Sequence, residues 1–337
     1  RTTPAPMAAT RIEKLEQPAK EILSLAVLFS ALLSPPSIAA GFNIAAPDAT
    51  QTGLQFIFQG PEASSIGLDE ENPFTVGGGE QTLDFFFEGQ NNALLGTLRG
   101  AQLAVDVDFG GGSNTLDFLT QDNGLEVSAI TLAVTGDGNN FNFIQEEGTL
   151  ELREFEFNLE LIGGANTFSL QSNDISQYAW EISGADNSFA VTQTETLITS
   201  QELSWRGDQG TATFDFTGAS EIALATVVDG LRTTLTQRFE SADQASVTTT
   251  LMGDDNTLAL SAVNVSVLNY LVAVNGASNL LSLSAENATN ARLDLEVLGN
   301  RNTISTLQRD VSDASIQVRL KGSDNQLTIE QSATPGL

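Results

Sequence analysis

Residues 276–302 read GASNLLSLSAENATNARLDLEVLGNRN, one complete repeat with the pattern Gly-x-x-Asn at both ends. The Gly of this pattern recurs every 23 residues from Gly184 to Gly322, over seven units without insertion or deletion. With looser spacing the same turn extends backward to Gly163, Gly136, Gly111 and Gly89, and to a degenerate copy at Gly60. A repeat of fixed length over most of a chain indicates an array of similar units rather than two globular domains.

Within each unit the apolar residues alternate on both sides of the turn, which is typical of strands with one buried face. They precede Gly299 at Leu293, Leu295 and Val297, and they follow Asn279 at 281 and 283. A polar junction, such as 286–290, closes each unit. We therefore predict an all-β fold, a two-layered β-solenoid of about twelve strand-turn-strand coils of 21–29 residues, with strands of six to eight residues.

One coil is not expected to be stable by itself. Its five or so inward apolar side chains contribute about 10 kcal/mol, whereas ordering 23 residues costs about 1–2 kcal/mol for each residue. Stacking is therefore required. Three other architectures fit less well: calcium-binding nonapeptide repeats have a period of nine, lyase-type β-helices have three strands and long loops, and antiparallel sandwiches do not need an invariant period.

The turn is the candidate structural site. Equivalent residues of stacked coils form columns about 4.8 Å apart, so the Asn column is predicted to form an amide ladder. The alternative is that each Asn is tolerated singly for its left-handed tendency. A second, patchier column holds Gln145, Gln193, Gln308 and Gln331. The predicted turn and ladder residues are Gly184, Asn187, Gly253, Asn256, Gly276, Asn279, Gly299, Asn302, Gly322, Asn325, Gln308 and Gln331.

Charge also follows the repeat. The residue two past each Gly is often acidic, and stacked carboxylates repel one another. Arg232 and Arg301 interrupt this column, and we interpret them as residues that break up the like charge. Asp137, Asp254 and Asp255 offer loose calcium ligands, although no regularly spaced calcium loop is present.

The overall composition excludes several functions. The 43 acidic against 14 basic side chains give a net charge of -29, which disfavours nucleic acid as a partner because phosphate binding needs a basic groove. Without His or Cys, the chain has no thiol or His-assisted catalysis and no ordinary zinc site. No setting singles out a pair of carboxylates as catalytic, so we expect neither an enzyme nor a bound cofactor.

The first 40 residues resemble a secretory signal. The apolar run 22–33 is too short to cross a bilayer, and small residues around Ala39 suit cleavage after that residue. We divide the chain into a signal with upstream residues (1–40), a short linker (41–53), the solenoid (54–331) and a tail (332–337). The mature protein is then expected to be secreted, extracellular or on a bacterial surface, without a transmembrane segment.

The outward positions next to the Asn form a nearly uncharged face of Thr and Ser. It includes Thr211, Thr213, Thr234 and Thr236, and Leu280 interrupts it. Flat Thr-x-Thr faces resemble those of ice-binding proteins, so a monomeric surface or ice-binding β-solenoid is the alternative function. Thr is also a good strand residue on any solvent face.

Residues 314–331 resemble a curlin repeat. Gly322, Asn325 and Gln331 match that family's Gly-x-x-Asn turn and closing Gln, as do Gly184, Asn187 and Gln193, while Ala314 and Leu320 replace its opening Ser and first Gln. The resemblance implies a secreted curli-like subunit that self-assembles into amyloid surface fibres, a form of pilus, for cell adhesion and biofilm matrix. It also implies the partners: further copies of the chain in a homopolymer, a nucleator subunit and an outer-membrane secretion pore.

Overall fold

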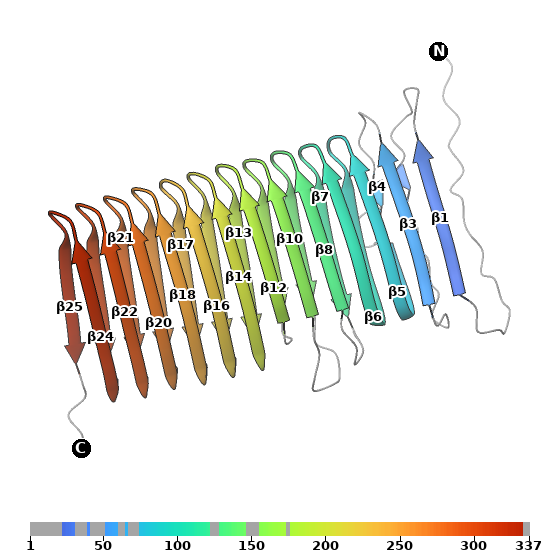
Figure 1. Cartoon of the computed structure of the whole chain (residues 1–337). Coiled ribbons are helices and arrows are strands. Elements are labelled where there is room, and N and C mark those ends of the chain that lie inside the picture. The colour runs from blue at the N-terminus through green and yellow to red at the C-terminus, as the bar shows by residue number, and fades with distance from the viewer. Residues whose placement is uncertain are drawn as a thin grey trace, which may run out of the picture.

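The computed structural model describes residues 22–30, 39–40, 51–59, 65–66, 74–121, 128–145, 155–172 and 176–332. In these ranges the chain forms 25 strands and no helix, and therefore no helix that could span a membrane. The strands stack as coils along one axis, with the N-terminal strands at one end and the C-terminal coil at the other (Figure 1). The predicted two-layered β-solenoid is confirmed.

Every strand pairing is parallel and joins one coil to the next, within one of two layers. The first layer contains β1 (Ile22–Ser30), β3 (Gln51–Gln59), β8 (Ser128–Thr135), β10 (Phe155–Ile162), β12 (Ser176–Ser183), β14 (Ile198–Arg206), β16 (Glu221–Asp229), β18 (Gln244–Met252), β20 (Val267–Asn275), β22 (Asn290–Leu298) and β24 (Asp313–Lys321). The second layer contains β2 (Ala39–Ala40), β4 (Ser65–Ile66), β7 (Thr115–Gln121), β9 (Asn140–Gln145), β11 (Thr167–Ser172), β13 (Ser188–Thr194), β15 (Thr211–Thr217), β17 (Thr234–Glu240), β19 (Thr257–Val263), β21 (Leu280–Glu286), β23 (Thr303–Arg309) and β25 (Gln326–Ser332).

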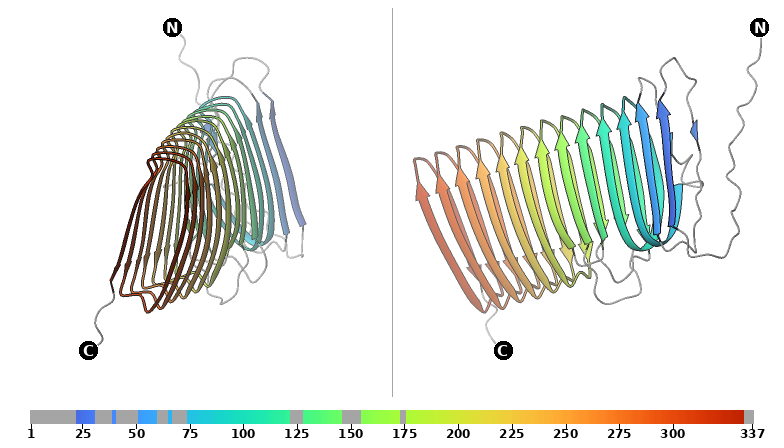
Figure 2. Two further views of the ribbon diagram at one scale, coloured as in Figure 1. Left: turned by 60° about the vertical axis from the view of Figure 1, so that its left-hand side comes forward. Right: turned by 45° about the vertical axis from the view of Figure 1, so that its right-hand side comes forward.

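Two long strands connect the layers. β5 (Phe74–Glu88) and β6 (Ala93–Gly110) belong to the second layer at their start and to the first layer at their end. β6 accordingly pairs with β7 through Ala93–Arg99 and with β8 through Ala104–Gly110. β5 and β6 also pair with one another in both layers. In the later coils the two layers face one another as separate sheets (Figure 2).

The C-terminal half shows how the 23-residue period is made. Each coil has a nine-residue strand, a four-residue Gly turn, a seven-residue strand and a three-residue junction, so the first-layer strands are one residue longer than predicted. Eleven Gly turns, from Gly89 to Gly322, lie among the described residues and delimit ten coils. The predicted unit at Gly60 lies outside them, as do most of the predicted linker and tail.

The core lies between the layers, where the predicted inward positions are buried. Phe157, Leu159 and Leu161 are at most 3% exposed, and the equivalent residues of most later coils are similarly buried. Aromatic rings stack from coil to coil, with Phe168 and Phe189 centroids 5.2 Å apart and those of Phe216 and Phe239 5.5 Å apart. This repeated burial is the main source of stability, because each coil alone buries too little apolar surface.

Two sequence predictions need refinement. In the C-terminal coils, the junction predicted to be polar contains a buried residue, such as Ala242, Val265 or Ala288, and the residue before each of these three has φ of 55–57°. The last coil differs from the others, because Leu327 is 39% and Ile329 is 48% exposed, although both occupy inward columns. No described coil covers them.

Candidate functional site

The Gly column is set by steric contact between coils. A Cβ atom on any of the ten glycines from Gly111 to Gly322 would lie 1.8–2.1 Å from the carbonyl oxygen of the turn glycine in the preceding coil. Real Cβ atoms do not approach backbone so closely. Gly is therefore required wherever one coil stacks on another, independently of its backbone conformation.

Asn side chains fill the space beside this contact. In eight links, the Asn Oδ1 accepts a hydrogen bond of 2.8–2.9 Å from the backbone N–H of the equivalent residue in the preceding coil. The Nδ2 donates to the turn-glycine carbonyl of that same coil, as from Asn279 to Gly253 at 3.1 Å. In four pairs Nδ2 also reaches the next Asn, as from Asn302 to Asn325. Seven of these eight Asn side chains thus satisfy two backbone groups of the preceding coil, whereas Asn114 satisfies one.

The remaining Asn residues of the predicted set hold the same place: Asn187, Asn256 and Asn325 donate to Gly163, Gly230 and Gly299 at 2.9 Å. None of these Asn residues has a left-handed backbone. It is the residue before each of them that does, with φ of 55–60° wherever it is not Gly. The Asn is therefore selected for its hydrogen bonds rather than for its own backbone conformation.

Among the described coils the ladder is interrupted at two successive turns, where Gly210 and Thr233 stand in place of Asn. A Cβ on Gly210 would lie 1.9 Å from the Trp205 ring. The indole Nε1 instead donates to the Gly207 carbonyl at 3.3 Å, as does the hydroxyl of Thr233 from the next coil. A buried aromatic side chain thus replaces an amide at this coil, and the sequence pattern does not reveal it.

Acidic residues one past the Gly have a role that the sequence did not reveal. Oδ1 of Asp137, Asp208 and Asp254 accepts the backbone N–H of the next coil's equivalent residue at 2.6–2.8 Å, and Asn300 does the same at 2.7 Å. Asp137 and Asp254, considered above as loose calcium ligands, are thus engaged with backbone. Within the described part of the chain, no three acidic side chains form a group that could hold a metal ion.

The residue two past the Gly is exposed in most C-terminal coils, including Arg232 and Arg301, and Ser278 is half-buried. Arg232 follows Gln209 and precedes Asp255 in its column, and Arg301 lies between Ser278 and Asp324. None of the ion pairs among the described residues involves either Arg. Arg232 and Arg301 therefore affect this column by alternating its charge along the stack.

The Gln residues are divided between core and surface. Gln145, Gln193 and Gln308 are buried, whereas Gln331 is exposed in the last coil. Gln308 and Gln331 are register partners, but no side-chain hydrogen bond joins them among the described residues. Gln193 accepts from Gln201 at 2.7 Å and donates to the Tyr178 hydroxyl at 3.0 Å.

A second buried polar cluster surrounds Gln237. Its Oε1 accepts from the hydroxyls of Tyr270 and Thr249 at 2.6 and 3.2 Å, and its Nε2 donates to Thr226 at 3.2 Å. Burial raises the pKa of the Tyr270 hydroxyl, which keeps it protonated as a donor. These contacts join the two layers through the core.

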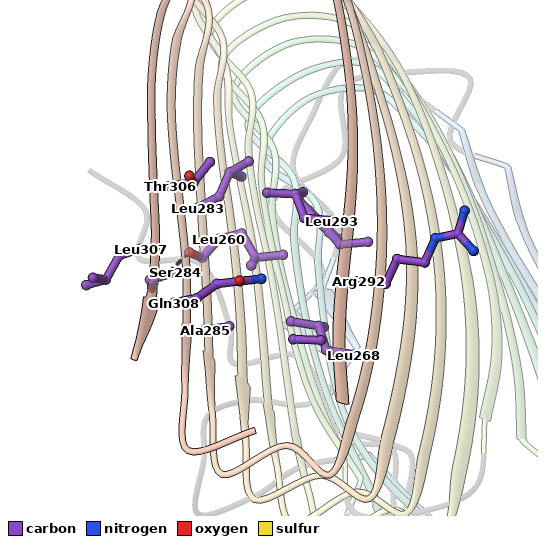
Figure 3. A pocket seen from close by; sticks show the side chains of 12 residues that line it. Leu260, Leu268, Leu283, Ser284, Ala285, Arg292, Leu293, Thr306, Leu307 and Gln308 are labelled. Atoms are coloured by element: carbon purple, nitrogen blue, oxygen red, sulfur yellow. Dashed lines mark hydrogen bonds between the residues drawn. The ribbon is translucent and has the colours of Figure 1, made fainter. Parts of the chain in front are cut away.

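A small cavity lies between the layers near the C-terminal end (Figure 3). Its volume is about 20 Å³, close to that of a single water site, and Leu260, Leu283 and Leu293 line it. Thr306 Oγ1 and Gln308 Oε1 also belong to this region, and neither has a hydrogen-bond partner among the described groups. The cavity is too small for an organic ligand.

The outer faces of the layers differ in charge. The first layer has a shallow depression of about 580 Å³ whose lining includes Glu160, Glu181 and Glu202. The second layer carries the Thr and Ser face, where Thr211, Thr234 and Thr257 are successive register partners. The adjoining column is also uncharged from Asn142 to Thr328.

Carboxylates crowd the first layer near its N-terminal end. Asp84 and Asp106 are register partners on adjacent strands, and Asp108 follows on β6. Burial, and then the charge of Asp106, raise the pKa values of Asp84 and Asp108. A raised carboxyl pKa means that ionisation destabilises the native state at neutral pH, an effect lost as the pH falls through that pKa.

Comparison with known proteins identifies no relative: no family model, no curated protein and no solved structure matches this chain.

Substituting a stacking glycine is expected to disrupt the stack. Gly253→Ala places a Cβ against the Gly230 carbonyl and should cost more than about 4 kcal/mol. Gly218→Ala, also at positive φ but with no contact under 3.6 Å, should cost only about 1–2 kcal/mol. Urea unfolding followed by circular dichroism measures both, and equal losses would contradict the steric explanation.

Removing an unpaired buried hydroxyl should be tolerated. Thr306→Val is expected to raise the free energy of unfolding by about 1 kcal/mol or leave it unchanged. The control is Thr249→Val, which removes a donor to Gln237 and should lower it by about 1–3 kcal/mol. A clear loss for Thr306→Val in urea unfolding would show that its hydroxyl has a partner in solution.

The Asp cluster predicts a pH-dependent gain in stability. Asp106→Asn removes one source of repulsion, so it should stabilise the protein at pH 7 and lower the pKa values of Asp84 and Asp108. The gain should disappear as the pH falls through the raised pKa values of Asp84 and Asp108, because protonation of these two carboxyls removes their repulsion. Glu202→Gln changes the net charge equally on the same layer, and the same profile for both variants would indicate a general charge effect.

Proposed function

We propose that this chain is a secreted, curli-like structural protein whose copies assemble into amyloid surface fibres for cell adhesion and biofilm matrix. One observation carries the proposal: the described coils join through parallel ladders and a glycine contact, with an Asn bridge in eight of the ten links, and the last coil has a surface of the same kind that no described coil covers. Such an edge is a template for strand addition.

The curlin resemblance of the Gly-x-x-Asn units supports the same role and the surface location. It also suggests the partners, a nucleating subunit and an outer-membrane secretion pore. A stacked, strongly acidic solenoid suits a structural role, because its stability comes from repetition while its charge keeps it soluble until copies associate.

Fibre formation and its dependence on charge test this proposal. Purified protein should form unbranched fibres that bind thioflavin and give cross-β diffraction near 4.8 Å, which is about the spacing between neighbouring parallel strands.

Salt reduces the Debye length from about 30 Å at 0.01 M to about 10 Å at 0.1 M. Because screening weakens repulsion between chains of charge -29, salt, divalent cations or a pH near 4 should shorten the lag.

The double substitution Arg232→Glu and Arg301→Glu should lengthen the lag, because it fills two gaps in the acidic column. A protein that stays monodisperse for days at high concentration and moderate salt would refute assembly. A lag that is independent of salt and of the double substitution would show that electrostatics does not limit association.

The Thr and Ser face supports a second candidate function, ice binding by a monomeric surface β-solenoid. The observation that favours it is the alignment of Thr211, Thr234 and Thr257, and of Thr213 with Thr236, on one outer face. Thermal hysteresis or altered ice-crystal shape is the expected result. Absence of both in a folded sample would leave strand propensity as the reason for these residues.

A further inference from the structure

The two ends of the solenoid differ in charge. Residues 51–121 contain ten acidic side chains and one basic side chain, whereas residues 290–332 contain six acidic and five basic ones. Arg319 and Lys321, on the last first-layer strand, are exposed and form none of the ion pairs described above. The strongly acidic N-terminal coils are therefore repelled less by the C-terminal coil, which presents Arg319 and Lys321, than by the N-terminal coils of a second copy.

The C-terminal coil is one half of a coil-to-coil interface. β24 pairs with β22 and β25 pairs with β23, and no described strand pairs with their other edges. Leu320, in an inward column, is 38% exposed, whereas Val297 in the coil before it is fully buried. Where a described coil is followed by one with an Asn at the turn, the backbone N–H at the position of Asn325 donates to the Asn side chain of that following coil. Asn279 donates in this way to Asn302, and Asn302 to Asn325.

The opposite end presents a strand of matching length and register. β3 has nine residues and ends one residue before Gly60, as β24 has nine and ends one residue before Gly322. Leu54, Phe56 and Phe58 of β3 are register partners of the core residues at 83, 85 and 87. In the structure, however, β1 pairs with all nine residues of β3 on the edge away from β5.

We infer that this β3 edge receives the C-terminal coil of a second copy, and that β1 occupies the edge until residues up to about 40 are removed. The inference rests on the proposed function, because it names the contact through which copies assemble. Hydrolysis of the peptide bond after Ala39, in which water adds to give a new carboxylate and a new amine, would separate β1 from the solenoid. An intact chain is then capped at one end, and a processed chain can grow at both.

The cap is effective because β1 belongs to the same chain. Its effective concentration at the β3 edge exceeds the concentration of any second copy in solution. Cleavage converts this intramolecular competitor into a separate peptide that dilutes away. Assembly would thus be prevented before export and permitted after it, with the same segment serving as the predicted signal and as the cap.

Disulfide trapping tests the contact, because the chain has no cysteine of its own. In the inferred register Gln317 of β24 meets Gln55 of β3, and both side chains are exposed in the structure. Neighbouring parallel strands lie about 4.8 Å apart, within the Cα separation of about 4.4–6.8 Å that a disulfide requires. Gln317→Cys and Gln55→Cys are therefore made singly, in full chains carrying a protease site between residues 40 and 41.

The two variants are mixed with oxidised glutathione before and after protease treatment, and disulfides are identified by mass spectrometry. Roughly a tenfold rise in the 317–55 disulfide after cleavage is expected, since the intramolecular competitor is then removed. Gln55→Cys mixed with Thr248→Cys is the matched control, because Thr248 is exposed in the same column as Gln317 but lies within the stack. This control pair should give little disulfide at either stage.

The outcomes separate this inference from the proposed function. Equal 317–55 trapping before and after cleavage overturns the cap while leaving assembly intact. Fibres without the 317–55 disulfide overturn the contact while supporting fibre formation. If the 317–55 disulfide forms without fibres, the contact is supported and the proposed fibre is refuted. If neither the disulfide nor fibres form, both the contact and the proposed fibre are refuted.

A variant of the uncleaved chain tests the cap without cleavage, so that the result does not depend on whether cleavage disrupts the structure. Val27, the register partner of Phe56, is replaced by Asp to weaken the hold of β1 on the edge, with Val27→Leu as the control. Val27→Asp should increase the 317–55 disulfide without protease, whereas Val27→Leu should not. Unchanged trapping by Val27→Asp, with circular dichroism like that of the unmodified chain, would also overturn the inference.

Discussion

The contact between successive turn glycines is the constraint on which the rest of the solenoid depends. Each glycine lies so close to the carbonyl of its predecessor that a single carbon atom does not fit between them. This close approach brings the turns together at the spacing of the strands, so that parallel ladders run without offset on both sides. A bulkier turn would separate the coils where the two layers join, and the core side chains would lose contact in both.

The Asn column adds direction to this contact. Seven Asn side chains bind both an N–H and a carbonyl group of the coil before them, so a coil is completed by its successor rather than by its predecessor. Such an arrangement makes the two ends of the stack chemically different. The two ends also differ in charge, and the last coil exposes its apolar columns. Both differences run along the same axis as the Asn contacts.

The surplus of acidic side chains is compatible with stacking because few of them are stacked directly. Some accept backbone N–H groups at the turns, others alternate with Arg or neutral residues, and the Thr and Ser face omits charge over two adjoining columns. The crowded group at Asp84, Asp106 and Asp108 is an exception, and its cost appears as raised carboxyl pKa values. Charge is thus carried by the outside of the solenoid while repeated apolar burial provides its stability.

The sequence alone determined the period, the alternation of buried residues and the two-layered solenoid, because these depend on local spacing that repeats along the chain. It also identified the Gly and Asn columns, but not why Gly is required, since that contact joins residues of different coils. Only the tertiary structure decided the replacement of an amide by Trp205, the bonds of Asp208 and Asp254, the Gln237 cluster and the pairing of β1 with β3. Such contacts depend on how far each side chain reaches toward the neighbouring coil or the opposite layer, which alternation along a strand does not specify.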